Sequence, residues 1–194
     1  MAKLGVLREL CELGECAKRL DLRFHMDGAR LSNALAALDA SPAEVTWKAG
    51  VDVLCFGGVK NGIAAGEAVV FFNRDLAFEF DYRCKQAGQL ASKMRFLSAP
   101  WIGLMGNQTW RRNAIHANHC ARLLHDGLRD IQGIRVMFPV EANSVFVEMP
   151  RAMITGLHDR GWRFYTFIGE GGVRLMCSWD TTRQDIDDFV RDIR

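Results

Sequence analysis

His25-Met26-Asp27-Gly28-Ala29-Arg30 and Phe56-Gly57-Gly58-Val59-Lys60-Asn61-Gly62 are the two stretches that decide the fold of this chain. In the first, an acidic residue closes a short apolar run. In the second, a lysine follows another apolar run within a glycine-rich turn. The stretches lie about 30 residues apart, which is the length of one strand–helix–strand unit. Asp27 and Lys60 are therefore expected at the carboxyl ends of neighbouring strands, where ligands bind in open α/β sheets.

A carboxylate and an amine at one sheet edge are what pyridoxal 5′-phosphate chemistry requires. The carboxylate keeps the pyridine nitrogen protonated, and the amine holds the aldehyde as a Schiff base. Gly57, Gly58 and Gly62 would let the backbone approach such a cofactor closely. Burial and nearby positive charge are expected to keep the Lys60 amine neutral. From these residues alone, plainer interpretations stay open: Asp27 as the N-cap of the following helix, and Lys60 as a solvated turn residue.

Four segments carry a resemblance to a known family. In chain order they are HMDGARLSNAL (25–35), SPAEVTWKAGVDVLCFGGVKNG (41–62), RCKQAGQLASKMRFLSA (83–99) and VRLMCSWDTT (173–182). They resemble segments of the low-specificity L-threonine aldolases, which belong to the β-eliminating lyase group of fold-type-I pyridoxal phosphate enzymes. The resemblance runs from about Glu15 to the C-terminus. Because family members are longer, it implies that this chain is the C-terminal portion of such an enzyme and that the missing part is N-terminal.

The fold class implied is α/β. Residues 1–106 are expected to form the C-terminal part of the cofactor-binding large domain of the fold-type-I pyridoxal phosphate transferase fold, and residues 107–194 a small α+β C-terminal domain. Apolar runs bounded by glycine and helical spacing of apolar residues predict the same alternation. Strands are predicted at 22–26, 51–56 and 67–72, and helices at 4–19 and 30–38.

Further helices and strands are predicted at defined residue ranges. The capping-box pattern Ser41-Pro42-Ala43-Glu44 predicts a short helix. A helical pattern over 76–97 is expected to be broken by Pro100, and a long helix should follow over 107–131. Beyond Gly133, strands are predicted at 134–138, 143–148, 162–167 and 173–178, with helices at 151–160 and 182–193.

The resemblance assigns roles to individual residues. Lys60 takes the Schiff-base position, and Asp27 forms a salt bridge to the pyridinium nitrogen; these two are the catalytic residues. Arg30 and Arg174 bind the substrate carboxylate, and Arg30 also contacts the cofactor. Arg95 is expected to reach the phosphate of a neighbouring subunit's cofactor. The alternatives are a structural ion pair for Arg174 and a solvated helix face around Arg95.

The reaction implied is retro-aldol cleavage of β-hydroxy-α-amino acids, in which L-threonine or allo-threonine gives glycine and acetaldehyde. Family members are homo-oligomers, so a dimer or tetramer is expected of the intact enzyme. The resemblance places the phosphate loop, a ring-stacking histidine and a substrate-contacting serine in the absent part, so this chain alone is expected to be a poor catalyst. Two alternatives remain: another β-eliminating lyase of the same cofactor class, and a non-catalytic truncated fragment or oligomerisation partner.

Composition and charge limit the partners and the cellular compartment that are expected of the protein. The 194 residues carry a net charge of +2 with both signs interspersed, which argues against a nucleic-acid or membrane-surface partner. No apolar run approaches the roughly 20 residues of a membrane span, and the first residues lack the apolar core of a signal peptide. The six cysteines form no C-x-x-C pair, which is typical of reduced thiols in a cytoplasmic protein.

The histidines receive no chemical role at this point. His116, His119 and Cys120 have the i, i+3, i+4 spacing of a zinc site on a helix, but no carboxylate completes the set, so no metal is predicted. His25 is interpreted as structural and is expected on the strand face opposite Asp27.

Overall fold

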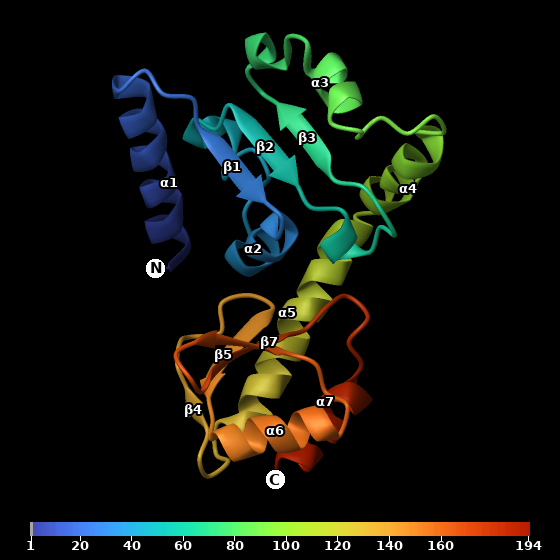
Figure 1. Cartoon of the computed structure of the whole chain (residues 1–194). Coiled ribbons are helices and arrows are strands. Elements are labelled where there is room, and N and C mark those ends of the chain that lie inside the picture. Colours follow the sequence, from blue (N-terminus) through green and yellow to red (C-terminus); the bar gives the residue numbers. More distant parts are fainter. Residues whose placement is uncertain (1) are drawn as a thin grey trace. The chain divides into compact units, whose positions relative to one another are not determined.

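A computed structural model describes residues 2–194, and the chain divides into two compact units (Figure 1). The first unit ends at Arg111 and the second runs from Arg112 to Arg194. Helix α4 (Arg95–Gly106) ends at the predicted boundary, whereas α5 (Thr109–Leu128) passes through the observed division. The assignment of 1–106 and 107–194 to a cofactor domain and a small domain stays a prediction.

The first unit is built on a three-stranded sheet in the order β1-β2-β3. Strands β1 (His25–Gly28) and β2 (Val53–Phe56) are parallel, and β3 (Ala68–Phe71) runs antiparallel to β2 (Figure 1). The helices α1 (Ala2–Arg19) and α2 (Leu31–Leu38) precede and follow β1. The connection from β1 through α2 to β2 is the strand–helix–strand unit that the sequence predicts.

The two faces of this sheet differ in burial. Met26, Leu54 and Phe56 belong to an apolar cluster that also contains residues of α1 and α2, among them Leu31 and Leu35. Because successive strand side chains alternate between faces, the residues between them point to the other side. That second set, which includes His25, Asp27, Cys55 and Val69, is half-buried or exposed. The sheet therefore presents the Asp27 carboxylate on its open face.

The capping box at Ser41 forms but does not begin an α-helix. The Ser41 N–H donates to Glu44 Oε2 (2.8 Å), and the Glu44 N–H donates to Ser41 Oγ (3.4 Å). Turns and the 3-10 helix η1 (Trp47–Ala49) follow. Tight packing on α1 explains the short segment, because a Cβ on Gly14 would lie 2.1 Å from the Ala49 carbonyl oxygen. Tertiary contact here overrides the local helix signal.

The prediction that Pro100 breaks a helix was wrong. The predicted 76–97 segment contains the 3-10 helix η3 (Arg74–Ala77) and α3 (Phe80–Gln86), and α3 ends just before Gly88, whose φ is 69°. Pro100 lies inside α4. The proline leaves the carbonyl of residue 96 without its usual helical donor. Pro100 is exposed, so water can satisfy that carbonyl.

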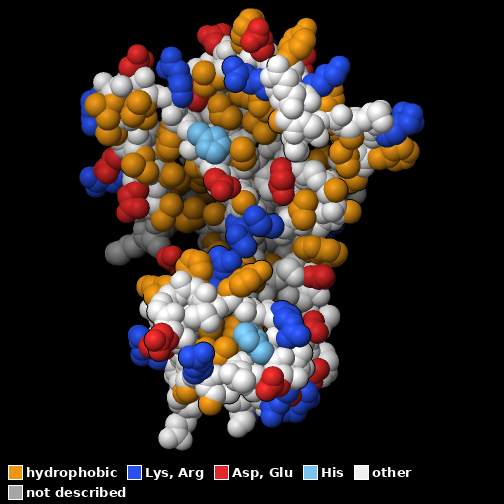
Figure 2. All heavy atoms as spheres, in the orientation of Figure 1, with side chains coloured by type: hydrophobic (Ala, Val, Ile, Leu, Met, Phe, Trp, Pro, Cys, Tyr) orange, Lys and Arg blue, Asp and Glu red, His pale blue; other side chains and the backbone are white. Residues whose placement is uncertain are grey.

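The first unit exposes large apolar side chains. Phe78 and Ile102 are each 77% exposed and Phe96 is 68% exposed. Figure 2 shows hydrophobic side chains at the surface of this unit. Surfaces of this kind are typical of contact regions, but oligomerisation stays a prediction.

The second unit packs helices against an antiparallel sheet in the order β4-β5-β7-β6. Its core contains Leu128, Val145, Val147, Leu157 and Val173, all 1% exposed or less. This α+β arrangement follows the predicted pattern with shorter strands. Besides α5, its elements are β4 (Arg135–Val136), β5 (Ser144–Glu148), α6 (Arg151–Asp159), β6 (Tyr165–Ile168), β7 (Gly172–Met176) and α7 (Arg183–Ile193).

Across residues 2–194, none of the helices has the length and apolar character needed to traverse a membrane.

Candidate functional site

Asp27 and Lys60 both lie at the carboxyl edge of the parallel strand pair. Asp27 pairs in register with Cys55, and Gly28 pairs with Phe56 at the end of β2. The Gly57 N–H then donates to the Gly28 carbonyl at 3.1 Å. Lys60 follows in the 3-10 helix η2 (Val59–Asn61). The topology thus places a carboxylate and an amine at the same end of neighbouring strands, as the sequence predicts.

The Asp27 carboxylate is fixed by its own loop. Its Oδ1 accepts a hydrogen bond of 3.0 Å from the Ala29 N–H. The N-cap position of α2 belongs to Arg30, which makes no side-chain cap, so Asp27 is not the N-cap. Among residues 2–194 the Asp27 carboxylate has no other hydrogen bond or ion pair, and its side chain is exposed. One carboxylate oxygen is therefore left for a ligand.

The turn that carries Lys60 is held before and after the lysine. The Gly58 N–H donates to Glu67 Oε2 at 2.6 Å, and a Cβ on Gly58 would lie 2.6 Å from the Trp101 ring. Gly62 closes the turn with a φ of 111°, a value that favours glycine. Gly58 is needed for close packing, and Gly62 is needed for its backbone angle.

Asn61 ties the same turn to the rest of the unit. Its side chain is 4% exposed, and its Nδ2 donates to Ser32 Oγ (2.8 Å) and to the Trp110 carbonyl (3.0 Å). Ser32 lies in the first turn of α2, directly after the Asp27 loop. A buried amide therefore links the lysine turn to the helix that follows the carboxylate.

The expected burial of the Lys60 amine is not observed. Lys60 is exposed in the described chain, and its amine forms no hydrogen bond or ion pair with another residue within 2–194. Lys60 lies beyond the end of β2 in the turn η2, and its neighbour Val59 is exposed as well. The position at the sheet edge was predictable, whereas the degree of covering was not.

The two arginines predicted in the first unit have different surroundings. Arg30 is half-buried and lies three residues after Asp27, at the start of α2. Arg95 begins α4, is exposed, and has its guanidinium carbon 5.2 Å from the centre of the Phe96 ring. Within the described residues, Arg95 forms no hydrogen bond or ion pair with Asp27 or Lys60. Of the two arginines, Arg30 shares the loop that carries Asp27.

Arg174 lies in the second unit within an aromatic setting. On β7 it pairs in register with Phe146 of β5 and Tyr165 of β6. Its guanidinium carbon is 5.0 Å from the centre of the Phe167 ring, and that ring is 5.7 Å from Phe146. Within the described residues, Arg174 Nε is buried and has no hydrogen-bond partner. A guanidinium in this state is suited to binding a carboxylate.

Sequence reasoning missed a contact on the open sheet face. His25 Nε2 lies 3.3 Å from Cys55 Sγ, across β1 and β2. His25 had been expected on the face opposite Asp27, and this was wrong, because residues two apart on a strand share a face. The strand period alone could have corrected the placement of His25. The contact itself depends on the register between the strands.

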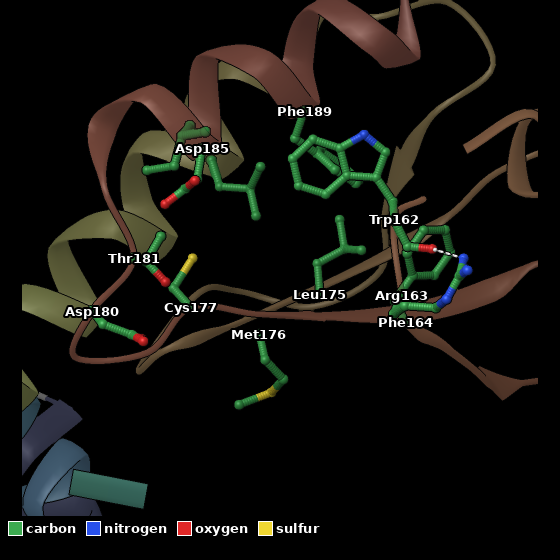
Figure 3. Close-up of a pocket in the computed structure, with 12 residues that line it drawn as sticks. Trp162, Arg163, Phe164, Leu175, Met176, Cys177, Asp180, Thr181, Asp185 and Phe189 are labelled. Carbon is green, nitrogen blue, oxygen red and sulfur yellow. Dashed lines mark hydrogen bonds between the residues drawn. The ribbon is translucent and has the colours of Figure 1, made fainter. Parts of the chain in front are cut away.

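A cavity of about 250 Å³ lies in the second unit and contains none of the predicted site residues (Figure 3). Trp162, Leu175, Cys177 and Phe189 are among its walls. Burial raises the pKa of the Cys177 thiol to about 12, so this thiol is a poor nucleophile at neutral pH. The cavity walls are largely hydrophobic core residues.

The predicted absence of a metal site stays a prediction. Among the described residues, no group of three histidine, cysteine or acidic side chains is placed to hold a metal ion. His116 Nε2 lies 2.8 Å from the Thr181 carbonyl and 3.5 Å from Cys120 Sγ.

Comparison with known proteins gives a family match over most of the chain. The model of the family described as "Beta-eliminating lyase" matches residues 5–152. A low specificity L-threonine aldolase of Pseudomonas aeruginosa is 62% identical over 186 residues, which cover 96% of this chain and 54% of that protein. Low-specificity L-threonine aldolase 1 of Arabidopsis thaliana is 30% identical over 139 residues, covering 71% of this chain and 38% of that protein. The chain spans about half the length of the Pseudomonas relative.

Solved structures agree with the expected fold. The threonine aldolase of Leishmania major superimposes with a TM-score of 0.85 at 28% identity, covering 96% of this chain and 55% of that one. A sphingosine-1-phosphate lyase of Burkholderia pseudomallei gives a TM-score of 0.72 at 16% identity, covering 95% of this chain and 47% of that one. The second likeness concerns the fold alone. Together they confirm the predicted fold class, a part of the fold-type-I pyridoxal phosphate fold.

Proposed function

The chain belongs to the β-eliminating lyase family, and from this membership we propose that it binds pyridoxal 5′-phosphate through Asp27 and Lys60. We further propose that it serves retro-aldol cleavage of β-hydroxy-α-amino acids, with L-threonine giving glycine and acetaldehyde. One observation carries the proposal: a carboxylate and an amine stand at the carboxyl ends of adjacent parallel strands. The names of the similar proteins support the choice of reaction.

The residues at this edge fit the proposed cofactor. A Cβ on Gly57 would lie 2.3 Å from the Ala29 carbonyl oxygen, so only glycine allows the lysine turn to lie directly against the Asp27 loop. Asp27 keeps one oxygen for a pyridinium N–H, and Lys60 is exposed at the same sheet edge. When bound, pyridoxal phosphate accepts the electron pair that is released when a bond to the substrate Cα breaks.

Each residue then has a separate task. The Asp27 carboxylate would stabilise the proton on the ring nitrogen of the bound cofactor, and the Ala29 N–H fixes that carboxylate. The Lys60 amine would hold the aldehyde carbon of the cofactor. Arg174 and Arg30 bind the substrate carboxylate, and the unpaired Nε of Arg174 supports its share of that role within the described structure.

The finer assignments follow the family resemblance. We propose that Arg95, at the exposed start of α4, binds the phosphate of a cofactor in a neighbouring subunit of a homo-oligomer. We also place the protein in the cytoplasm, because all six cysteines are free thiols and free thiols are typical of a reducing compartment.

Covalent labelling tests the cofactor ligands directly. The chain is mixed with pyridoxal phosphate, reduced with borohydride, digested and analysed by mass spectrometry. We expect the cofactor on Lys60, its loss in Lys60→Ala, and weaker labelling in Asp27→Asn. Lys48 and Lys85 serve as internal controls, because each is exposed and lies outside the edge. Labelling spread equally over all lysines would refute the assignment.

A second assay separates the reaction from its alternatives. Threonine is supplied to the cofactor-loaded chain, and acetaldehyde is measured with a coupled dehydrogenase. Acetaldehyde formation that requires Lys60 supports the aldolase assignment, whereas ammonia and a keto acid would indicate another β-eliminating lyase. Labelling at Lys60 without turnover would support a non-catalytic role. The exposure of Lys60 in the described chain is the observation that favours this last alternative.

A further inference from the structure

We propose that Cys55 is a base-assisted reactive thiol, that His25 is its base, and that small electrophiles such as peroxides modify it. The inference is independent of cofactor binding and rests on the side chains of two adjacent strands. His25 Nε2 lies 3.3 Å from Cys55 Sγ, which is within reach of proton transfer from a thiol to an imidazole.

The strand register holds the two side chains on one face. His25 pairs with Val53, and Asp27 pairs with Cys55, so the imidazole and the thiol meet diagonally across β1 and β2. His25 is exposed and Cys55 is half-buried. A small reagent can therefore reach the sulfur from the open face of the sheet, while neighbouring strand side chains restrict larger ones.

One charged residue lies on the same face as the pair. Asp27 pairs in register with Cys55 and lies two residues after His25 on β1. From β3, the facing residues are Val69 and Phe71, which are uncharged. Asp27 is thus the charged residue that the register sets beside this pair in the described sheet.

The other cysteines provide matched comparisons. Cys120 also lies near a histidine, with Sγ 3.5 Å from His116 Nε2, but it is 2% exposed and burial raises its pKa. Cys16 and Cys84 are half-buried like Cys55, yet within the described chain neither forms a hydrogen bond with a histidine. The same molecule therefore contains two accessible thiols without a neighbouring histidine, Cys16 and Cys84, and one buried thiol beside a histidine, Cys120.

Oxidation by hydrogen peroxide can be written with every atom assigned. His25 accepts the thiol proton, and the Cys55 thiolate attacks one peroxide oxygen. The O–O bond breaks, and the sulfur is oxidised to a sulfenic acid. The second oxygen leaves as hydroxide and takes the proton from the His25 imidazolium, which gives water and restores the neutral imidazole.

The test measures alkylation of each cysteine in the native chain. The protein without cofactor is exposed to limiting iodoacetamide at pH 7, and each thiol is quantified by peptide mass spectrometry. A positioned general base typically contributes about 10²–10⁴-fold, and for an exposed pair we expect Cys55 to react at least about tenfold faster than Cys84. With peroxide followed by a sulfenic-acid trap, Cys55 should again be labelled first.

Two histidine substitutions test whether His25, rather than the exposure of Cys55, causes the fast reaction of this thiol. In His25→Gln, the Cys55 rate should fall to within about twofold of the Cys84 rate, while the Cys84 rate stays unchanged. His119→Gln, which removes another exposed histidine, should leave Cys55 unaffected. Equal rates for Cys55, Cys16 and Cys84, or a fast Cys55 that His25→Gln does not slow, would overturn the inference. Because no cofactor is present, either outcome leaves the proposed function untouched.

Discussion

Asn61 donates a hydrogen bond of 2.8 Å to Ser32 Oγ, and both side chains are buried. The bond joins two segments that carry different chemistry. Asn61 directly follows Lys60, and Ser32 lies in the first turn of the helix that follows Asp27 and Arg30. The relative placement of the amine and the carboxylate therefore depends on Asn61, whose side chain is buried.

Asn61→Ala should destabilise the chain and loosen the lysine turn. The substitution leaves Ser32 Oγ and the Trp110 carbonyl without this donor, which costs about 1–3 kcal/mol for buried polar groups. Urea unfolding measures the loss, and pyridoxal phosphate labelling of Lys60 should weaken in parallel. Gln89→Ala is the control, because that amide is exposed and its hydrogen bond is long, at 3.5 Å. Equal stability of the two variants would contradict the structural role.

Gly58→Ala should be destabilised by steric overlap alone. The φ of Gly58 is −91°, which alanine adopts readily, but the new Cβ would lie 2.6 Å from the Trp101 ring and 2.8 Å from the Gly66 carbonyl oxygen. Overpacking of this kind costs about 1–3 kcal/mol. Unfolding followed by tryptophan fluorescence measures the effect.

Gly103→Ala is the matched control for this overlap. Gly103 lies inside α4, and nothing lies within 4 Å of its added Cβ. This change should stabilise the chain by up to about 1 kcal/mol through the greater helix propensity of alanine. A neutral Gly58→Ala would show that the turn repacks freely.

The sequence predicted the first unit well where one local pattern dominates. The spacing of Leu7, Leu10 and Leu13 marks α1, and glycines bound the apolar run that becomes β2. Pro100 shows the limit of local rules, because a proline within a helix is tolerated where its neighbouring carbonyl faces water. The capping box at Ser41 shows the reverse, since a correct local signal yields to packing against Gly14.

In the candidate site, too, some features can be predicted from the sequence and others cannot. The positions of Asp27 and Lys60 at one sheet edge follow from chain order and topology, so sequence reasoning reaches them. The exposure of Lys60, the contact between His25 and Cys55, and the aromatic setting of Arg174 depend on register and on what covers each residue. Register is set by whole-strand pairing, which no single motif encodes.

Arg174→Met should raise the stability of the second unit. In the described structure the buried Nε of Arg174 has no partner, and an unsatisfied buried donor costs about 1–3 kcal/mol. Methionine has similar length and suits the aromatic surroundings of Phe167 and Phe146. We expect a gain of about 1 kcal/mol in the free energy of unfolding, together with loss of carboxylate binding, as is typical of functional residues.

Arg163→Met provides the comparison for this gain. Arg163 is exposed, and its Nη1 donates to the carbonyls of His158 (2.9 Å) and Trp162 (3.1 Å). A change at such a surface position should stay within about 0.5 kcal/mol. If Arg174→Met unfolds more easily than wild type, the guanidinium makes a favourable contact, and its interpretation as an unpaired ligand group fails.

Thr182→Ala should weaken α7 in a pH-dependent way. Thr182 and Asp185 form a reciprocal capping box, with the Thr182 N–H donating to Asp185 Oδ2 at 2.7 Å and the Asp185 N–H to Thr182 Oγ1 at 3.1 Å. Losing the cap costs about 1 kcal/mol at pH 7. Hydrogen bonds from Thr182 lower the pKa of Asp185, so their stabilisation exists above the unfolded pKa of about 3.9. It is lost as pH falls through the lower folded value.

Urea unfolding at pH 7 and in acid measures this dependence. The stability gap between wild type and Thr182→Ala should narrow as the pH is lowered. Asp187→Asn, which removes an exposed ion pair to Arg183, should have a smaller effect at pH 7. A gap that widens in acid would contradict the assigned direction of the Asp185 pKa.

Cys177 should make the second unit sensitive to alkali. Burial, followed by the nearby Cys120 thiol, raises the folded pKa of Cys177 to about 12, whereas an unfolded thiol titrates near 8.5. The native state thus retains its proton while the unfolded state ionises. The corresponding stabilisation is complete below pH of about 8.5 and is lost progressively as pH rises toward the folded value.

In Cys177→Ala this loss of stability in alkali is absent, although the smaller side chain lowers stability at neutral pH. Urea midpoints measured under reducing conditions should therefore converge between about pH 8 and about pH 10, a range that runs from about 0.5 unit below to about 1.5 units above the unfolded thiol pKa. Cys84→Ala, which removes a half-buried thiol of the first unit, should run parallel to wild type over the same range. Parallel curves for Cys177→Ala would show that this thiol ionises equally in both states and would remove the basis for treating it as chemically inert.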